Sequence, residues 1–259
     1  MRMDSGARMN RDDLNWQVEE ACRQAWPAAL ETIAHGWLLR RSGGRIRRPN
    51  SANPLRGARG APAEVIDAAE AFYAGHTQAP LFRIPDLADE LELDLDRRGY
   101  SREGGTIHLY GEIEALRGNS GDGIMVSPTP TENWFAARFR TGGYDEAEQR
   151  IFRRMTSLIV GDRAFVSCER DGEVAAFAFG VIRNGLLVLE AVETDARFRQ
   201  QGLGRRTVGG LIGWAREAGA RAACLQVVAD NTPARALYAS LGFDHELYRY
   251  HYRRKLPSA

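Results

Sequence analysis

The sequence predicts a mixed α/β fold of the α+β kind, with a mostly antiparallel mixed sheet flanked by helices. Three observations predict it. Apolar residues recur at helical spacing in several segments of both halves. Apolar runs separated by Asp171-Gly172 and Asn184-Gly185 indicate three strands joined by hairpin turns. A glycine-rich junction and a helix then lead to another strand, which indicates one βαβ crossover.

Length and composition indicate a globular protein of two domains. The 259 residues exceed one average domain, and 44% hydrophobic with 27% charged residues is typical of soluble proteins. The polar stretch 116–123 is the best linker, so we predict domains at 1–119 and 120–259. The formal charge of +1 gives no overall field for nucleic acid, which we do not expect as a partner.

The termini and cysteines favour a cytoplasmic location. The first residues contain no apolar signal region, and no apolar run is long enough to span a membrane. The three cysteines lack metal-type spacing, so reduced thiols are expected. The five histidines are scattered and no metal or serine-hydrolase motif is present, so we expect no metal. Oligomeric state stays open, a homodimer included.

The first domain is expected to begin with a helix at 12–26. A hairpin with its turn at Ser42–Gly44 is expected in 36–55. The remaining predicted elements are a helix at 62–75 between Pro62 and Gly75, a strand at 79–86, a helix at 87–99 with leucines four apart, and a strand at 104–113.

The second domain is expected to start with a short strand at 123–127 and two helices. The predicted elements, in order, are helices at 131–140 and 145–158, strands at 163–169, 173–184 and 184–194, a helix from about Leu203, a strand at 221–230, a helix at 233–242, and one or two strands in 243–254.

The junction "RFRQQGLGRR", Arg197 to Arg206, is a candidate phosphate site. Gly202 and Gly204 allow close approach of the backbone, and the helix start offers unpaired N–H groups with a partial positive charge. A glycine-rich turn with solvated arginines is the competing interpretation. A dinucleotide fingerprint is a further alternative, but Thr207 stands where it requires glycine or alanine, and the preceding hairpins do not fit a parallel sheet.

A second motif, "ADNTPARALYASLGF", follows the next predicted strand. Asn231 stands at the strand exit and Pro233 in a first helical turn. Ala234, Tyr238 and Leu241 share one helix face with Leu237. Alone, Tyr238 is as readily a core aromatic residue whose hydroxyl is satisfied.

From Trp134 to Tyr252 the chain resembles the GNAT acetyltransferases, which transfer an acetyl group from acetyl-CoA to an amine. The family's glycine signature is matched by Arg199, Gly202 and Gly204. Its later motif is matched by Asn231, Ala234, Leu237, Tyr238, Gly242 and Phe243. The first domain resembles the degenerate amino-terminal part of tandem GNAT-like bacterial proteins, and it lacks the glycine signature, so we do not expect it to bind CoA.

The resemblance implies a GNAT fold and a site for acetyl-CoA as cosubstrate. Pantetheine is expected along the strand that ends at Thr194, and the pyrophosphate on the loop from Gln200 to Arg205. The cofactor-binding residues expected from the resemblance are Val192, Thr194, Arg199, Gln200, Gln201, Gly202, Leu203, Gly204, Arg205, Asn231 and Ala234.

Two residues are candidates for catalysis. Tyr238 matches the family's motif tyrosine and is expected to protonate the departing CoA thiolate. Glu190 is the candidate general base, because regular strand parity puts it on one face with Val188, Val192 and Thr194 and puts Glu193 on the other. A bulge would swap those faces, and an ion-paired carboxylate is the competing interpretation of Glu190.

An arginine-rich segment in the first domain contains no acidic residue. Its arginines are Arg40, Arg41, Arg45, Arg47, Arg48, Arg56 and Arg59. It is consistent with binding an acidic substrate or RNA. The favoured alternative is a solvated hairpin facing the acid-rich segment with Asp86, Asp89, Glu90, Glu92 and Asp94.

The sequence thus predicts an N-acetyltransferase that acts on a primary amine of a small molecule, by direct attack in a ternary complex. A non-catalytic acyl-CoA-binding regulator is the alternative from another class. Acetylation of a protein N-terminus or lysine is a third interpretation.

Overall fold

The computed structural model describes residues 10–118 and 123–255, called here the N-terminal and C-terminal halves. The described strands form one 11-stranded sheet, in the order β1-β2-β3-β4-β11-β5-β10-β9-β8-β7-β6. The strands are β1 (Leu30–Ala34), β2 (Trp37–Arg41), β3 (Ala52–Pro54), β4 (Leu81–Pro85), β5 (Ser101–Glu112), β6 (Ile124–Ser127), β7 (Arg163–Arg170), β8 (Glu173–Arg183), β9 (Leu186–Thr194), β10 (Ala222–Val228) and β11 (His245–Arg254). The helices are α1 (Arg11–Ala25), α2 (Pro62–Ala74), α3 (Glu92–Arg97), α4 (Glu132–Gly142), α5 (Glu146–Ser157), α6 (Leu203–Glu217) and α7 (Thr232–Leu241), with 3₁₀ turns η1 (Arg48–Asn50) and η2 (Ala196–Phe198).

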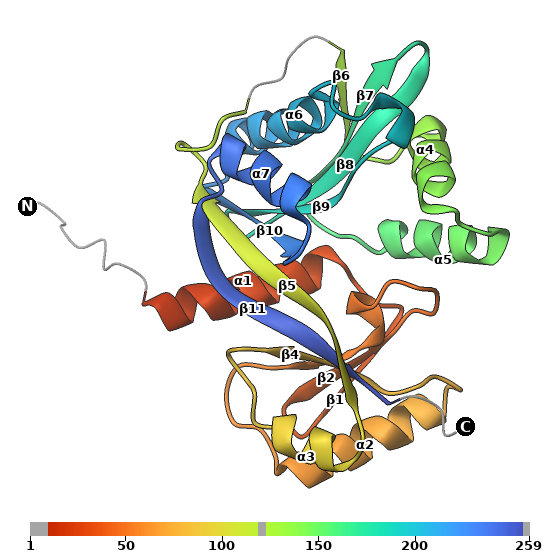
Figure 1. Ribbon diagram of the computed structural model, residues 1–259, viewed down its shortest axis with the longest axis vertical. Coiled ribbons are helices and arrows are strands. Elements are labelled where there is room, and N and C mark those ends of the chain that lie inside the picture. The colour runs from red at the N-terminus through yellow and green to blue at the C-terminus, as the bar shows by residue number, and fades with distance from the viewer. Residues whose placement is uncertain (1–9, 119–122, 256–259) are drawn as a thin grey trace, which may run out of the picture.

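Two long strands join the halves. β5 pairs with β10 in the upper part of the molecule, and β11 pairs with β5 along its length and with β4 in the lower part (Figure 1). The sheet is therefore continuous from one half to the other. The expected domain boundary at 119/120 lies outside the described residues, and the division into two domains stays a prediction.

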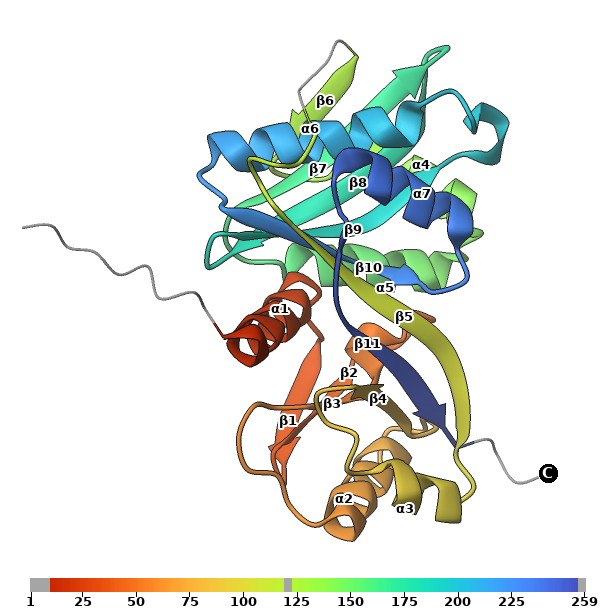
Figure 2. The same ribbon diagram turned by 60° about the vertical axis from the view of Figure 1, so that its left-hand side comes forward.

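Helices cover both faces of the sheet in the C-terminal half. α6 and α7 lie on one face, and α1, α4 and α5 lie on the other (Figure 2). The α6 face is packed by the apolar stripe of α6, which includes Val208, Leu211 and Ile212, all fully buried. This packing fixes the direction in which the α6 N-terminus points.

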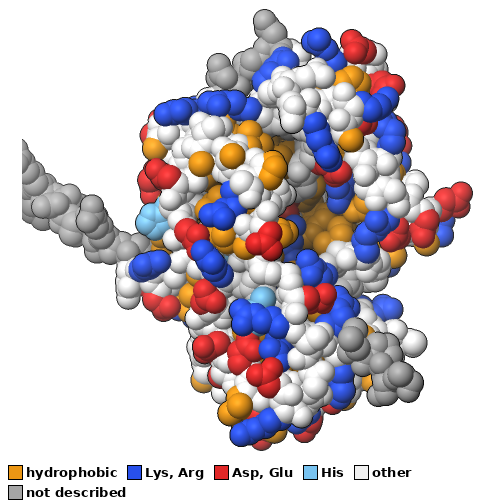
Figure 3. Space-filling view, in the orientation of Figure 1, with side chains coloured by type: hydrophobic (Ala, Val, Ile, Leu, Met, Phe, Trp, Pro, Cys, Tyr) orange, Lys and Arg blue, Asp and Glu red, His pale blue; other side chains and the backbone are white. Residues whose placement is uncertain are grey.

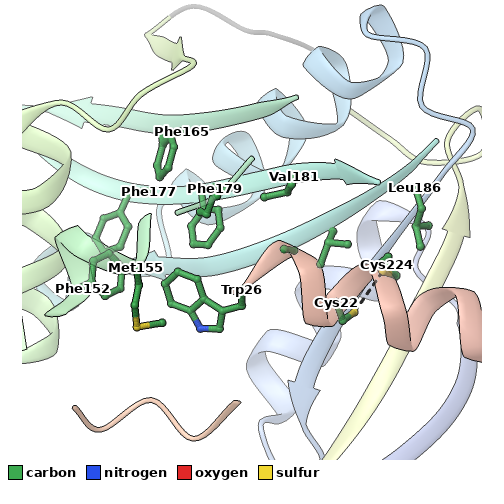
Figure 4. Close-up of a cluster of buried hydrophobic side chains, with 14 of the residues drawn as sticks. Cys22, Trp26, Phe152, Met155, Phe165, Phe177, Phe179, Val181, Leu186 and Cys224 are labelled. Carbon is green, nitrogen blue, oxygen red and sulfur yellow. Dashed lines mark hydrogen bonds between the residues drawn. The ribbon is translucent and has the colours of Figure 1, made fainter. Parts of the chain in front are cut away.

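The opposite face is packed by aromatic side chains from helices far apart in sequence. Trp26, which follows α1, contacts Phe152 of α5 at 5.5 Å and Phe179 of β8 at 5.2 Å between ring centroids (Figure 4). Cys22 and Cys224 lie in the same cluster with their Sγ atoms 3.8 Å apart. These two thiols and Cys168 are buried and free of disulfide bonds. α1 therefore anchors the N-terminal half to the C-terminal half.

The turn signals of the central strands are confirmed. The residue pairs Asp171-Gly172 and Asn184-Gly185 all have positive φ, from 52° to 79°, which type I′ hairpin turns require. β7, β8 and β9 consequently form an antiparallel meander. α6 then connects β9 to β10, which pairs with β9 in parallel. The mostly antiparallel mixed sheet and its crossover through α6 were predicted correctly, whereas a second parallel pair, β3 with β4 through α2, was missed.

Three local predictions differ from the structure. The helix expected at 87–99 covers only Glu92–Arg97, because 86–91 form successive turns with Ala88 N bonded to Pro85 O and Glu92 N to Asp89 O. The hairpin in 36–55 does pair β2 with β3, but its connection includes η1. An additional hairpin, β1–β2, was missed; its turn uses His35 and Gly36, both with positive φ.

Candidate active site

The sheet opens between the neighbouring strands β9 and β10. β10 pairs with β9 only as far as Leu225 opposite Leu189. Beyond these residues β9 continues alongside β8 to Thr194, whereas β10 continues alongside β5 to Val228. Among the described strands, none pairs with the edge of β9 that faces the opening, so the opening can accept an extended ligand by strand addition.

A bulge in β9 separates the residues expected to share a face. Phe179 is opposite Glu190, but Phe177 is opposite Glu193, so β9 carries an extra residue here, and Ala191 has φ +50°. Because Phe177 and Phe179 point to the same side, Glu190 and Glu193 do as well.

The expectation that Glu190 shares a face with Val192 and Thr194 is therefore wrong. Contacts support the corrected assignment. Arg138 of α4 donates to Glu193 at 2.5 Å, and Val192 packs against the α6-side cluster. Thr194 Oγ1 lies on the α6 side too, close to Gly204.

Two glycines shape the start of α6. Gly202 has φ +74°, which favours glycine, and no side chain caps the helix N-terminus there. A Cβ on Gly204 would lie 3.1 Å from Thr194 Oγ1 and 3.6 Å from Leu237 of α7. Glycine thus allows the end of β9, the start of α6 and the side of α7 to meet, with the first α6 amide groups uncapped by any side chain.

The other residues of the loop between β9 and α6 differ in their exposure and in their hydrogen bonds. Gln200 has φ +60° and is exposed, as is Gln201, whereas Leu203 is buried. Arg199 Nε donates to Thr194 O at 3.4 Å. Arg205 donates to the side chain and carbonyl of Ser240 at 3.1 and 3.2 Å, and so ties α6 to α7.

Asp195 stabilises the loop at its beginning, and sequence reasoning missed it. Its carboxylate accepts hydrogen bonds from the backbone and side chain of Arg197 and from Arg140. Hydrogen bonds from Arg197, together with the charges around it, hold the pKa of Asp195 well below its usual range. The loop between β9 and α6 is thereby held in one conformation before Gly202.

α7 carries the tyrosine of the second motif. Asn231 caps this helix through a 3.1 Å bond from Ala234 N, and Pro233 lies in the first helical turn as predicted. Tyr238 is 7% exposed and packs edge-on against Phe243. Its hydroxyl has no hydrogen-bond partner within the described part of the chain. Burial, and then the negative charge of Glu190, raise the pKa of Tyr238 above its usual value.

Glu190 is bound to an arginine of the N-terminal half. Arg48 of η1 donates from both guanidinium nitrogens to both carboxylate oxygens, each at 2.5 Å. Glu190 is only 3% exposed. Burial alone would lower the pKa of Arg48, but the charge of Glu190 raises it above its ordinary value. The structure thus shows Glu190 as an ion-paired carboxylate, its competing interpretation, and the two halves meet at this pair.

The other arginines of this segment do not face the acid-rich segment as expected. Only Arg59 pairs with one of its residues, Glu90. The remaining ion pairs go to separate elements and join Arg40 to Glu31, Arg45 to Glu148, Arg47 to Glu103 and Arg56 to Asp13. These partners are spread over the molecule. Proximity in sequence to one acidic segment therefore did not predict the ion-pair partners of the arginines.

Between the halves the surface is hollowed. The space-filling view shows this hollow with hydrophobic side chains on its floor and Arg or Lys side chains around it (Figure 3). Within 10–118 and 123–255, no group of three or more His, Cys, Asp or Glu side chains is arranged to hold a metal ion. None of the described helices has the length and apolar character needed to cross a bilayer.

Comparison with known proteins assigns the family. A family model described as "Probable histone acetyltransferase Rv0428c C-terminal" matches residues 16–253. The chain belongs to this acetyltransferase family. It is thus a GNAT-type acetyltransferase, which confirms the resemblance found in the sequence, and the match spans both halves.

Relatives of this GNAT protein extend over almost its whole length. The uncharacterized N-acetyltransferase YobR of Bacillus subtilis is 21% identical over 249 residues, which are 94% of this chain and 99% of YobR. A GCN5-related N-acetyltransferase from Kribbella flavida has a TM-score of 0.67 at 18% identity and covers 99% of this chain and 98% of its own. A tandem GNAT protein from the clavulanic acid biosynthesis pathway has a TM-score of 0.62 at 13% identity, with coverage of 99% and 91%. These structures share the GNAT fold of the present chain.

Proposed function

We propose that the chain transfers the acetyl group of acetyl-CoA to a primary amine of a small molecule, by direct attack within a ternary complex. The parting of β9 and β10 beside the uncapped start of α6 is the observation that carries this proposal. The unpaired edge of β9 is suited to an extended ligand chain, and the start of α6 is suited to a diphosphate.

In this proposal the coenzyme follows β9 to the start of α6. Pantetheine bonds to the β9 backbone near Val192 and Thr194, and the pyrophosphate accepts bonds from amide groups of the loop. The residues assigned to the coenzyme are Val192, Thr194, Arg199, Gln200, Gln201, Gly202, Leu203, Gly204, Arg205, Asn231 and Ala234. Gly202 and Gly204 are the most important of these residues. A side chain at Gly202 would be strained by the positive φ, and a Cβ at Gly204 would lie close to Thr194.

The reaction joins nitrogen to the acetyl carbon and releases the thiol. The amine nitrogen attacks the thioester carbonyl carbon, and collapse of the tetrahedral intermediate breaks the C–S bond. Tyr238 donates its proton to the leaving sulfur, and Glu190 accepts the proton released by the amine. Because burial raises the pKa of Tyr238, its hydroxyl is protonated when the C–S bond breaks, as a proton donor must be.

The shape around Glu190 favours a small acceptor. Arg48 reaches Glu190 from the N-terminal half, and the Glu190 side chain is only 3% exposed, which leaves little room there for a polypeptide. The description of the matching family favours a protein amine as the second candidate. A protein acceptor would require a groove open enough for a peptide on both sides of the thioester.

The proposal is tested by thiol release and calorimetry on the full chain. Acetyl-CoA is expected to bind, and one class of small amine is expected to release free CoA thiol in proportion to acetylated amine. Gly202→Glu should abolish binding, while the protein still folds. Absence of binding heat with acetyl-CoA would overturn the proposal, binding without thiol release from any amine would identify a CoA-binding regulator, and release only with peptides would identify the second candidate.

A further inference from the structure

A separate basic pocket lies in the N-terminal half, away from the coenzyme loop. It has a volume of about 390 Å³ and opens between the loop after β2, the segment after α2, and the end of β11. Its lining includes the guanidinium groups of Arg41, Arg45, Arg47 and Arg254 and the residue His76. Among the described residues, no Asp or Glu side chain lines it. The pocket uses part of the arginine-rich segment that the proposed acetyl transfer leaves unexplained.

The arginines of this pocket outnumber the carboxylates that reach them. Glu103 bonds Arg254 at 2.6 Å and lies 4.0 Å from Arg47, whose guanidinium also covers the Tyr252 ring at 4.6 Å. Glu148, outside the pocket, pairs with Arg45. Within the described residues, two carboxylates thus reach three of the four guanidinium groups, and none reaches Arg41. The pocket carries an excess of positive charge that an anion would compensate.

Arg41 is the least satisfied of these arginines. Its single described hydrogen bond is a 3.5 Å contact from Nη2 to the His76 carbonyl, at the limit of hydrogen-bond length. Its Nε is buried without a partner within the described residues. A buried guanidinium N–H without a hydrogen-bond partner lowers the stability of the fold unless a ligand accepts a hydrogen bond from it. Arg41 is therefore the residue from which a ligand would gain most.

The pocket wall is held in a fixed and partly strained conformation. Asn50 is 6% exposed; its side chain accepts from Ser42 N and Gly43 N at 2.8 and 2.9 Å and donates to two carbonyls of the same loop. Gly43 and Gly44 both have left-handed φ. On the other side Thr77 has φ +54°, which is unfavourable for a β-branched residue. Strain of this kind is concentrated at ligand sites.

We propose that this pocket binds an organic phosphate monoester. A phosphate dianion matches the two positive charges left uncompensated, and the planar guanidinium group suits bidentate contact with phosphate oxygens. A volume of about 390 Å³ is more than a phosphate group needs, so it also accommodates the organic part of the ligand. The site is distinct from the α6 loop assigned to the pyrophosphate.

The test is calorimetry on the full chain saturated with CoA, with phenyl phosphate as the probe and inorganic phosphate and succinate in parallel. Arg41→Gln is expected to weaken phenyl phosphate binding by about tenfold or more, since a hydrogen bond to a charged group is lost. Arg56→Gln is the matched control, because Arg56 belongs to the same segment but pairs with Asp13 outside the pocket. Thermal unfolding of both variants shows that they are folded.

Each other outcome overturns the proposal in a defined way. No heat with any phosphate probe, or unchanged binding in both Arg41→Gln and Arg47→Gln, would exclude the pocket as the site. Equal affinity for succinate would exclude phosphate as the preferred ligand class. Loss of binding in Arg205→Gln instead would place the anion at the α6 start, and that result would bear on the coenzyme loop rather than on this pocket.

Discussion

Arg48 and Glu190 form a bidentate ion pair across 142 positions of sequence, and this pair connects η1 of the N-terminal half to the bulge in β9. The carboxylate is buried, so the pair replaces the water that the charge would otherwise require. The N-terminal half thus supplies a charge at the centre of the candidate site. The N-terminal half can therefore contribute to the candidate site through Arg48 without binding coenzyme itself.

The first prediction concerns the stability of this pair. Arg48→Gln leaves the Glu190 carboxylate buried without its cation, and we expect the free energy of unfolding to fall by about 2–3 kcal/mol. The double variant Arg48→Gln/Glu190→Gln should recover most of that loss, because no charge is then left unpaired. Urea unfolding of both single variants and the double variant measures the coupling. Strictly additive losses would show that the pair contributes no interaction energy.

The second prediction concerns Tyr238. Tyr238→Phe removes the proposed proton donor but preserves the ring that packs on Phe243, so we expect turnover to fall about 100-fold with little change in the acetyl-CoA dissociation constant. Steady-state thiol release and calorimetry measure the two quantities. Tyr100→Phe is the control, since its hydroxyl bonds Glu70 in the N-terminal half. Equal losses of turnover and binding would instead make Tyr238 a binding residue.

The third prediction separates backbone strain from coenzyme binding. Gly202 and Gly219 stand at opposite ends of α6, have φ of +74° and +79°, and have open space where a Cβ would lie. Alanine at either position should cost about 1 kcal/mol of unfolding free energy, because both residues are left-handed. Only Gly202→Ala is expected to weaken acetyl-CoA binding, by about tenfold, because its Cβ lies at the amide groups proposed to hold the pyrophosphate. Weaker binding in Gly219→Ala as well would attribute the effect to stability alone.

Local signals made much of this fold predictable from the sequence. The hairpin turns were visible because Asp-Gly and Asn-Gly adopt positive φ readily, and the glycine loop was visible because Gly202 and Gly204 precede an apolar helical stripe. The motif around Asn231 and Tyr238 was equally clear. These features depend on residues close together in the chain.

Long-range pairing and backbone irregularity could not be predicted in the same way. The bulge depends on Ala191, a residue that does not signal positive φ, so strand parity gave Glu190 the wrong neighbours. Arg48 finds Glu190 only through tertiary structure, and one acidic stretch nearby in sequence suggested the wrong partners. The joining of both halves in one sheet likewise depends on β11, the last strand of the chain.

The fourth prediction concerns the pH dependence of stability. His108 is fully buried, its ring stacks on Tyr248 at 4.0 Å, and Arg83 Nη2 lies 3.4 Å from its Nε2. Burial, and then the positive charges of Arg83 and Arg48, lower the pKa of His108 well below its usual value. Below pH about 6.5 the unfolded chain binds a proton here that the folded chain does not. The stability contributed by the neutral imidazole is therefore complete above that pH and is lost as the pH falls toward the folded pKa.

His108→Gln removes this titration, so the wild type is expected to lose its stability advantage over the variant as the pH falls from 7.5 to 5.5. The gap should shrink by up to about 1.4 kcal/mol per pH unit below 6.5, the slope for one proton. Urea unfolding of both proteins across this range measures it. His245→Gln is the control, because His245 is an exposed histidine of β11. A gap that stays constant for His108→Gln would mean that the buried imidazole takes up a proton in the folded protein, with Arg83 displaced from its present position.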